Sequence, residues 1–451
     1  MTLPGEKVHM MAVSGAGMSI MAAVMAQVGY RISGCDLRPG LVAKRLRELG
    51  IEVLEGHDPS HVQGADLVVY SAAIKEDNPE LVEARKSGIE TISRAQMLGR
   101  LMSGKRGIAV AGTHGKTTTT SMLGTLLVEA GLDPTVLIAD GDLDVAGNAR
   151  LGNSDLFLTE ACEAFNSFHE LHPQIAVVTN IEADHLDCHG SLDGVIASFR
   201  RFLSQIGEGG LAVVCSDCPN VRGVAPFISR KVITYGLNED ADYHAYDVDI
   251  SSMTPLFQTA VRGRHLGEFK LQVPGAHNVL NALAAIAVAN ELKADPETMK
   301  EALWGFHGAA RRFEALGTAR GITVVDDYAH HPTEVKATLA AARAWGRRTI
   351  AIFQPHLFSR TEFFAKEFAE SLSAADEVIL TDIYAAREKP MPGVSARLIA
   401  DRIGHARLIP DKGRIAQELI PSLKSGDLVI VMGAGDIRSV GEDILRRLSD
   451  E

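Results

Sequence analysis

The feature of this sequence that most constrains its fold is a glycine loop between an apolar run and a helix-forming segment. The apolar run is Arg106–Ala111, the loop sequence GTHGKTTTT covers Gly112–Thr120, and a helical pattern continues from Thr117 to about Glu129. A strand that passes through a glycine loop into a helix is a building unit of parallel sheets. The chain is therefore predicted to be an α/β protein.

The same alternation of short apolar runs and amphipathic stretches recurs in three series along the chain. We expect strands at Val8–Val13, Tyr30–Cys35 and Ala65–Tyr70, then Arg106–Ala111, Leu156–Glu160 and Ile175–Asn180, then Ile322–Asp326, Thr349–Phe353, Glu377–Thr381 and Leu428–Val431. A length of 451 residues also suits about three domains. We therefore predict three α/β domains with mostly parallel sheets, covering residues 1–103, 104–316 and 317–451.

The composition excludes several classes of partner. Hydrophobic residues make up 46% and charged residues 23%, which is ordinary for a globular chain. The net charge of −12 argues against a broad basic surface for nucleic acid or an anionic membrane. The stretch from Val8 to Tyr30 lacks Asp, Glu, Lys and Arg, but Gly15, Gly17 and Ser19 interrupt it as in a strand, loop and helix. We expect neither a nucleic-acid partner nor a membrane span.

The five cysteines form an odd and sparse set, which favours a reducing cytoplasm over an oxidised, secreted scaffold. Cys215 and Cys218 form a C-x-x-C motif, but no second pair or suitably spaced histidine follows it. We expect this motif to be a loop after a strand rather than a metal or redox site.

The central glycine loop has the chemistry of a nucleoside triphosphate site. Backbone N–H groups at a helix N-terminus attract phosphate, Lys116 adds a positive charge, and the Thr117 hydroxyl can bind Mg²⁺. The motif is the shorter GxxGKT, because Val110 occupies the first glycine position of GxxxxGK[ST]. The residues expected to bind ATP here are Gly112, Thr113, His114, Gly115, Lys116, Thr117 and Thr118.

A second glycine loop follows the first predicted strand, at Ser14–Ser19. Its backbone N–H groups at a helix N-terminus could likewise bind a phosphate or pyrophosphate. Asp36, at the end of the next strand, could hold a ribose hydroxyl. Tight packing of a helix on a strand is the alternative explanation for these glycines.

Acidic, imidazole and amide side chains follow other predicted strands or begin helices. Glu160 and His185 stand just past strands, where they could bind a divalent cation together with Thr117, and an imidazole among oxygens suits Mn²⁺ as well as Mg²⁺. Asn278 and Asn281 lie three residues apart on one helical face and could read an adenine edge, with an N-cap role as the alternative.

The third series carries a polar array at its strand ends. Its members are Asp326, Asp327, Tyr328, His330, His331, His356 and Arg360. Arg311 and Arg312 come shortly before it and suit a phosphate or domain-closure role, with plain surface solvation as the alternative. The spacing of His330, His331 and Glu334 is not HExxH, so we do not expect a zinc site there.

Taken in order, GAGMS, GTHGKTT, DDYAHHPTE, FQPHLFSRT, DIYAAREKP and GAGDI resemble the motifs of the Mur ligase family over essentially the whole chain. This family contains the ATP-dependent, amide-forming enzymes of peptidoglycan precursor synthesis. The resemblance implies a Rossmann-like N-terminal domain for a UDP-sugar, a central P-loop-type ATPase domain, and a Rossmann-like C-terminal domain that closes over the amino acid. The motifs most resemble the branch that joins L-alanine to the lactyl carboxylate of UDP-N-acetylmuramate through an acyl phosphate.

The resemblance also implies a role for each matching residue. The UDP-sugar would contact Gly15, Gly17, Met18, Ser19, Asp36 and Ser71; the nucleotide would contact Asn278, Asn281, Arg312 and Asp327; and the amino acid would contact Tyr328, His330 and Arg360. Thr117 and Glu160 would hold Mg²⁺, and His185 a second ion. The expected catalytic residues are Lys116, Glu160, His185, His330 and Arg360.

The sequence departs from the family pattern at several positions. Ala12 replaces the first glycine of GxxGxGMS, Asp140-Gly141 replaces Gly-Gly, and Cys162 and Ala164 stand where acidic or polar residues are common. The stretch Ser191–Gln205 also lacks the lysine that many relatives carbamylate, which points away from the later-acting members.

Three other functions are compatible with parts of the sequence. A recycling ligase would attach a tripeptide to the same UDP-sugar, and a non-catalytic nucleotide-binding regulator would keep Lys116 without needing Tyr328, His330 or Arg360. An NAD-dependent dehydrogenase would explain Gly15 and Gly17 but not the Lys116 loop. The sequence does not separate L-alanine from glycine or L-serine, and we expect a monomer or homodimer.

Overall fold

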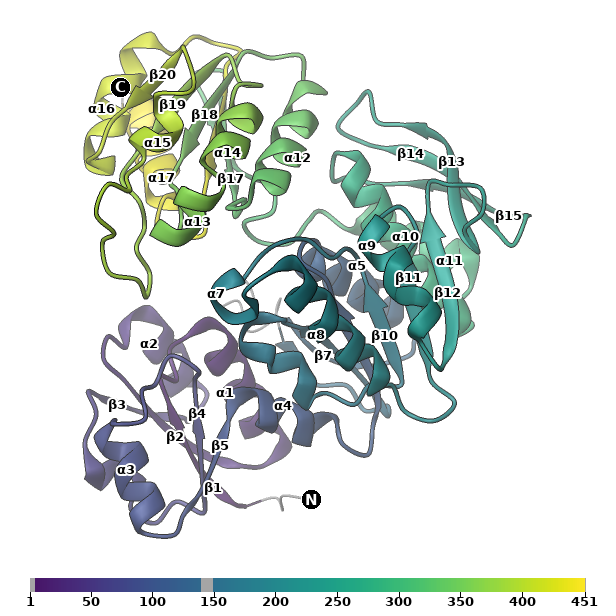
Figure 1. Ribbon diagram of the computed structural model, residues 1–451, viewed down its shortest axis with the longest axis vertical. Helices are drawn as coiled ribbons and strands as arrows, with labels where there is room; N and C mark the ends of the chain where they lie inside the picture. Colours follow the sequence, from purple (N-terminus) through teal and green to yellow (C-terminus); the bar gives the residue numbers. More distant parts are fainter. Residues whose placement is uncertain (1–4, 139–148, 451) are drawn as a thin grey trace. The chain divides into compact units, whose positions relative to one another are not determined.

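The structure is a computed structural model that describes residues 5–138 and 149–450 (Figure 1). Asp140-Gly141 lies outside the described residues. The chain forms two compact units. Unit 1 comprises Met1–Tyr246, Gln258–Phe269 and Leu280–Gly305, and unit 2 comprises Asp247–Phe257, Lys270–Val279 and Phe306–Glu451.

The first sheet has five parallel strands in the order β3-β2-β1-β4-β5. The strands are β1 Lys7–Met11, β2 Arg31–Asp36, β3 Glu52–Glu55, β4 Leu67–Tyr70 and β5 Glu90–Ser93. The helices are α1 Ala16–Val28, α2 Gly40–Glu48, α3 Pro79–Lys86 and α4 Arg94–Met102, with a 3₁₀ turn, η1, at Pro59–Val62. The order reverses between β1 and β4, which is the topology of a Rossmann-like sheet and the kind of place where ligands bind.

The second sheet has ten strands in the order β15-β14-β13-β12-β11-β10-β6-β9-β7-β8. Its strands are β6 Arg106–Ala111, β7 Thr135–Leu137, β8 Ala149–Arg150, β9 Leu156–Ala161, β10 Ile175–Val178, β11 Leu211–Cys215, β12 Lys231–Gly236, β13 Tyr243–Asp249, β14 Leu256–Val261 and β15 Arg264–Lys270. Its helices are α5 Lys116–Glu129, α7 Leu186–His189, α8 Leu192–Ser204, α9 Pro219–Val224, α10 Ala276–Glu291 and α11 Pro296–Gly305, and the 3₁₀ segments are η2 Ala164–Glu170 and η3 Ala225–Phe227. The strands around β6 pair in parallel, as expected.

The third sheet has six strands in the order β16-β17-β21-β18-β19-β20, and only the β16–β17 pair is antiparallel. The strands are β16 Glu314–Ala319, β17 Ile322–Asp327, β18 Thr349–Phe353, β19 Glu377–Leu380, β20 Ala406–Leu408 and β21 Leu428–Met432. The helices are α12 Pro332–Arg343, α13 Phe358–Phe363, α14 Ala365–Leu372, α15 Arg397–Ala400, α16 Ile415–Leu419 and α17 Arg438–Asp450, and the 3₁₀ segments are η4 Lys412–Arg414 and η5 Ile420–Ser422.

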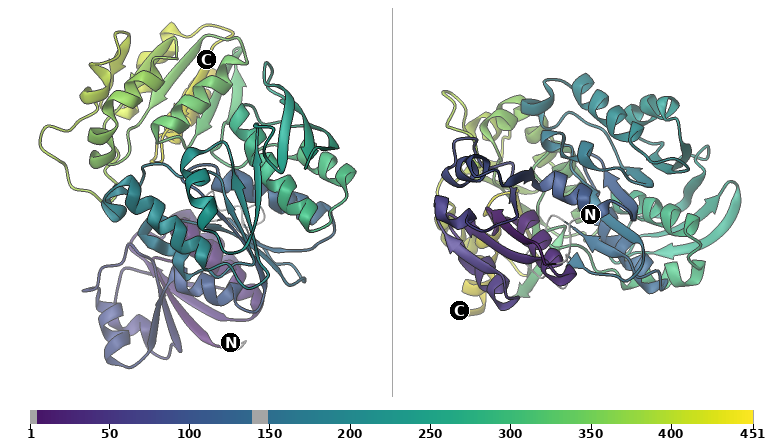
Figure 2. Two further views of the ribbon diagram at one scale, coloured as in Figure 1. Left: turned by 45° about the vertical axis from the view of Figure 1, so that its right-hand side comes forward. Right: turned by 90° about the horizontal axis from the view of Figure 1, so that it is seen from below.

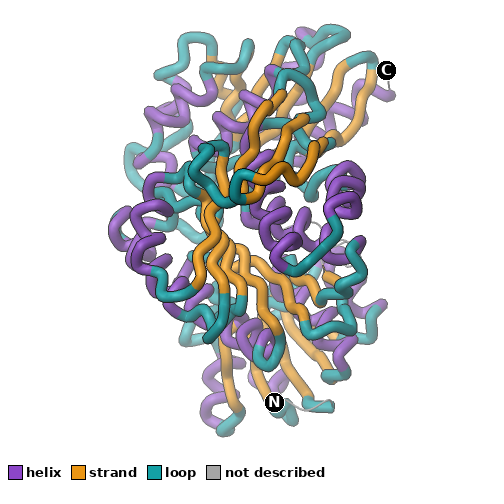
Figure 3. The backbone as a smooth tube through the Cα atoms, turned by 90° about the vertical axis from the view of Figure 1, so that its right-hand side faces the viewer, coloured by secondary structure: helices purple, strands orange, loops and turns teal. Residues whose placement is uncertain are grey.

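Helices cover both faces of the third sheet (Figure 2). Successive residues of β17 point to opposite faces, so Val325 packs in the core with α12, α14 and α15, and Val324 packs with α16 and α17. Strands buried on both faces read as continuous apolar runs, which is why β17, β18 and β21 were predictable. Figure 3 traces the strands and the helices along the backbone.

The predicted α/β fold with mostly parallel sheets is confirmed. The C-x-x-C motif lies where expected, with Cys215 at the end of β11 and Cys218 just before α9. No helix among the described residues is long and apolar enough to span a membrane. The domain boundaries remain predictions: position 104 lies between α4 and β6, whereas Gly317 lies inside β16.

Candidate active site

The central glycine loop joins β6 to α5 in unit 1 and requires glycine at two positions. Gly112 has φ 143° and Gly115 has φ 81°, a region that favours glycine. A β-carbon on Gly112 would collide with the Thr179 side chain, and one on Gly115 would approach Asn281 Oδ1 to 2.6 Å. The loop is therefore a close-fitting backbone cradle at the N-terminus of α5, as phosphate binding requires.

The residues just after β10 hold this loop in place. The Thr179 hydroxyl donates to the His114 carbonyl over 2.6 Å, and the His114 N–H donates to Asn180 Oδ1 over 2.8 Å. Thr113 N–H donates to the Asn180 carbonyl over 3.1 Å. Thr179 and Asn180 were not predicted as site residues, although their place just past a strand end is the signal that identified His185.

Lys116, in this loop, is paired with a carboxylate from the segment after β9. Its Nζ lies 2.9 Å from Glu163 Oε2 and 3.1 Å from the Thr113 carbonyl, and it also donates to the Gly112 carbonyl. Burial opposes the charge on Lys116, but the buried Glu163 carboxylate, together with neighbouring Cys162 and Glu160, raises the pKa of Lys116. Glu163 was not predicted as a site residue, because its partner lies 47 positions away in the sequence.

Thr117 and Glu160 meet as predicted. Thr117 Oγ1 donates to Glu160 Oε2 over 3.1 Å, and both side chains are buried. A hydroxyl and a carboxylate oxygen side by side are ligands that suit Mg²⁺ or Mn²⁺, so these residues fit the implied cation. His185 precedes α7 with φ 50°, and its Nε2 lies 3.9 Å from Asp184 Oδ2. Its role in holding a second ion stays a prediction.

The two asparagines of α10 lie inside the helix. Because α10 begins at Ala276, the N-cap alternative for Asn278 and Asn281 was wrong. Asn281 Oδ1 accepts from Thr119 Oγ1 over 3.2 Å, which places it against α5, and Asn278 Nδ2 donates to the Pro274 carbonyl over 2.7 Å. Adenine recognition by this pair stays a prediction.

The first glycine loop is bound to the end of β2. Ser14 N–H donates to Asp36 Oδ2 over 3.1 Å, so Asp36 orders the loop directly. Gly17, inside α1, leaves room for the Arg94 guanidinium, since a β-carbon there would approach Arg94 Nη1 to 2.6 Å. Arg94 is a cation beside the predicted pyrophosphate loop that the sequence did not single out. Ser71 directly follows β4, and its hydroxyl accepts from Ala73 N–H over 3.3 Å.

The polar array of the third sheet gathers in unit 2 as its strand-end pattern predicts. His330 Nδ1 lies 3.2 Å from Glu334 Oε2, and the rings of His330 and His356 are 5.7 Å apart. Arg360 Nη1 lies 3.0 Å from His356 Nδ1, and the Arg360 side chain is buried. His331 instead caps α12 together with Glu334, which gives it a structural role.

Asp327 and Tyr328 lie beside the paired arginines. Asp327 accepts from the N–H groups of Phe313 and Ala329 over 2.9 and 2.7 Å, and burial, opposed by Arg312, raises its pKa to about 6. The guanidinium carbons of Arg311 and Arg312 lie 4.8 and 5.0 Å from the centre of the Tyr328 ring. Both arginines therefore pack against Tyr328, and their phosphate or domain-closure role stays a prediction.

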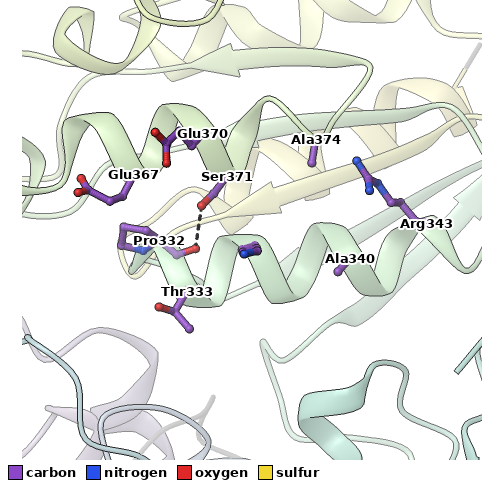
Figure 4. A pocket seen from close by; sticks show the side chains of 9 residues that line it. Pro332, Thr333, Ala340, Arg343, Glu367, Glu370, Ser371 and Ala374 are labelled. Atoms are coloured by element: carbon purple, nitrogen blue, oxygen red, sulfur yellow. Dashed lines mark hydrogen bonds between the residues drawn. The ribbon is translucent and has the colours of Figure 1, made fainter. Parts of the chain in front are cut away.

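A separate pocket of unit 2 lies between α12 and α14 (Figure 4). Pro332, Ser371 and Arg343 are among its lining residues, and the Ser371 hydroxyl donates to the Pro332 carbonyl over 3.1 Å. It contains none of the predicted site residues.

Comparison with known protein families shows which family the chain belongs to. Residues 7–106 match "Mur ligase family, catalytic domain", residues 110–289 match "Mur ligase middle domain", and residues 311–435 match "Mur ligase, glutamate ligase domain". The chain belongs to the Mur ligase family. The predicted family resemblance is therefore confirmed.

Individual Mur ligases resemble the chain over its full length. The UDP-N-acetylmuramate–L-alanine ligase of Geotalea daltonii is 44% identical, over 99% of this chain and 98% of that protein. The structure of a UDP-N-acetylmuramate–alanine ligase from Thermotoga maritima has a TM-score of 0.83 and 29% identity, covering 98% of both chains. A murein peptide ligase from Psychrobacter arcticus has a TM-score of 0.73 and 25% identity, covering 99% of both chains.

Proposed function

We propose that this Mur ligase joins L-alanine to the lactyl carboxylate of UDP-N-acetylmuramate, with conversion of ATP to ADP and phosphate. The observation that carries the proposal is the Lys116 phosphate loop with its Thr117–Glu160 pair, in a chain 44% identical over 99% of its length to an L-alanine ligase. The strand-end array of unit 2 adds the groups that an amino-acid substrate needs.

The chemistry explains why a phosphate loop serves amide formation. A carboxylate is a poor electrophile, so the γ-phosphoryl group of ATP first passes to a lactyl oxygen and gives an acyl phosphate and ADP. The alanine amine then attacks the acyl carbon, loses a proton, and phosphate leaves as the amide forms. Positioning and charge stabilisation supply most of the catalysis in such transfers.

Residues of the central loop have distinct proposed roles. Lys116 would exchange Glu163 for phosphate oxygens, and the backbone N–H groups at the start of α5 would bind the phosphates of ATP. Thr117 and Glu160 would hold Mg²⁺ or Mn²⁺, which when bound neutralises phosphate charge. Asn278, Asn281, Arg312 and Asp327 would contact the rest of the nucleotide.

The other two sites would bind the molecules to be joined. The first glycine loop, ordered by Asp36, would bind the UDP pyrophosphate, and Arg94 would add a positive charge. In unit 2, Arg360 would bind the alanine carboxylate with its two-pronged guanidinium, next to Tyr328 and His330. A cytoplasmic location and a monomeric or homodimeric state remain predictions from the sequence.

A steady-state assay of ADP release tests the proposal. Release is expected only when UDP-N-acetylmuramate and L-alanine are both present with ATP and Mg²⁺. The rival is a recycling ligase, the function suggested by the name of the Psychrobacter arcticus neighbour. Release that depends on the tripeptide and not on L-alanine would replace the proposed function with that rival.

A further inference from the structure

A cluster of metal-ligating side chains lies in the first sheet, apart from the three proposed substrate sites. His9 Nε2, Cys35 Sγ and a carboxylate oxygen of Glu80 lie within 4.8 Å of one another, and all three residues are buried. His57 extends the cluster, with its Nδ1 3.3 Å from both Cys35 Sγ and Glu80 Oε2. These are the sulfur, nitrogen and oxygen donors that zinc takes in proteins.

Three separations among the four donor atoms match those around a tetrahedral ion. Bond lengths of about 2.0 to 2.3 Å around zinc place neighbouring ligand atoms roughly 3.3 to 3.8 Å apart. His9 Nε2 lies 3.6 Å from Glu80 Oε2, and the two His57 separations are 3.3 Å. The Cys35–Glu80 separation is shorter, at 2.8 Å, because the thiol donates a hydrogen bond to the carboxylate.

His9 provides an independent sign of a ligand. Its side chain has no exposed surface, and its Nε2 lies 3.6 Å from Glu80 Oε2, which is longer than a normal hydrogen bond, with no closer hydrogen-bond partner among the described residues. A buried polar atom without a good hydrogen bond is costly in a folded protein. His9 Nδ1 lies 3.0 Å from the Ser33 hydroxyl; if Nδ1–H donates there, the Nε2 lone pair is left for a metal.

We infer that His9, Cys35, His57 and Glu80 form a structural zinc site. One thiolate and one carboxylate balance the charge of Zn²⁺, so a buried site with two neutral imidazoles is electrically neutral. When the ion binds, the thiol proton leaves to solvent and a sulfur–zinc bond replaces it. His61 Nδ1, 2.6 Å from Glu80 Oε1, orients the carboxylate from outside the ligand set.

The position of the cluster lets a metal ion reach it and lets a bound ion stabilise the first sheet. The side chains of His57 and His61 are 12% and 14% exposed, whereas that of Glu80 is fully buried, so an ion can enter from the histidine side. The donors come from β1, β2, the segment after β3, and α3. A bound ion would tie these four segments together and stabilise the first sheet beneath its glycine loop.

Metal analysis of the full chain tests this inference. After dialysis against a chelator, the protein should take up one equivalent of Zn²⁺ at micromolar concentration, and its midpoint of thermal unfolding should rise by about 5 °C or more. Co²⁺ in place of zinc should give a thiolate-to-cobalt charge-transfer band. Absence of both uptake and that band in the wild-type protein would overturn the site.

Two variants and one control assign the ligands. Cys35→Ser should abolish the thiolate-to-cobalt band and weaken zinc binding at least tenfold. His57→Asn, at a partly exposed position, should weaken zinc binding to a similar extent but retain the thiolate-to-cobalt band. As a control, Cys215→Ser changes another buried thiol and should leave the thiolate-to-cobalt band and the zinc affinity unchanged. An unchanged band in Cys35→Ser, with the protein folded, would place the metal elsewhere.

Discussion

Lys116 Nζ, in the glycine loop, and Glu163 Oε2, just after β9, lie 2.9 Å apart, and Glu163 is almost completely buried. The cation that the proposed reaction needs for phosphate is thus already paired with a carboxylate of the same unit. Removing one partner of a buried ion pair leaves an uncompensated charge, which is costly. This pair therefore links the stability of the loop to nucleotide binding.

Replacing Lys116 should nearly abolish the reaction. Lys116→Ala removes the only side-chain charge of the GTHGKT loop, and we expect kcat to fall at least about a hundredfold, which corresponds to about 3 kcal/mol of lost stabilisation. Single-turnover ADP formation measures this effect. Lys366→Ala, at a highly exposed lysine, is the control and should retain wild-type turnover. Wild-type turnover in Lys116→Ala would show that the loop is not the ATP site.

In Glu163→Gln, bound nucleotide should stabilise the protein against unfolding more than it does in the wild type. Without the carboxylate, Lys116 is left without its countercharge, and we expect the nucleotide-free protein to lose about 3 kcal/mol of stability. MgATP supplies new negative charge, so its stabilising shift in unfolding temperature should be larger in the variant than in the wild type. The exposed Glu208→Gln is the control. Equal shifts in Glu163→Gln and wild type would contradict the proposed exchange of partners.

Asp327 should make unit 2 less stable as the pH rises from about 4 to 6. Its pKa is raised to about 6 in the folded protein, so the folded state holds the proton more tightly than the unfolded state does. The stabilisation is present below the unfolded pKa of about 4 and is lost as the pH passes 6, a difference of about 3 kcal/mol. Carboxyl carbon NMR should show a titration near pH 6 that is absent in Asp327→Asn and retained in the exposed Asp401→Asn.

Ala12→Gly should stabilise the protein. Ala12 has φ 60°, a left-handed conformation that costs an L-residue with a β-carbon about 1 to 2 kcal/mol. Part of that gain is offset because glycine is more flexible when unfolded, so we expect a net gain of up to about 1 kcal/mol in denaturant unfolding. Ala22→Gly, in the interior of α1, should instead destabilise the protein. Loss of stability in Ala12→Gly would contradict the strain at this position.

Arg360→Lys should weaken amino-acid use without affecting ATP. Lysine keeps the charge but cannot form the two-pronged contact with a carboxylate, so KM for L-alanine should rise at least about tenfold while KM for ATP stays unchanged. Initial-rate kinetics with each substrate varied separate the two effects, and the exposed Arg402→Lys is the control. A change confined to the KM for ATP would remove Arg360 from the amino-acid site.

The sequence predicted those parts of the fold that depend on local pattern. β6 and β18 have the predicted bounds, because both are buried apolar runs. β3 and β5 were missed, since EVLE and ETIS are short and carry charged or polar residues. Such strands form because neighbouring strands pair with them, which no local pattern reveals.

The site was predictable where its residues follow strands or begin helices. Thr117 and Glu160 meet as expected. Glu163 and Asn180 were missed because their roles depend on hydrogen bonds to residues 47 and 66 positions away.

Mass spectrometry of the product tests the central proposal most directly. The protein is incubated with ATP, Mg²⁺, UDP-N-acetylmuramate, and equal amounts of L-alanine, glycine, L-serine and the tripeptide. We predict that UDP-N-acetylmuramoyl-L-alanine is the main product and that one ADP forms per amide bond. A tripeptide adduct as the main product, or no amide product while ATP is bound, would contradict the account.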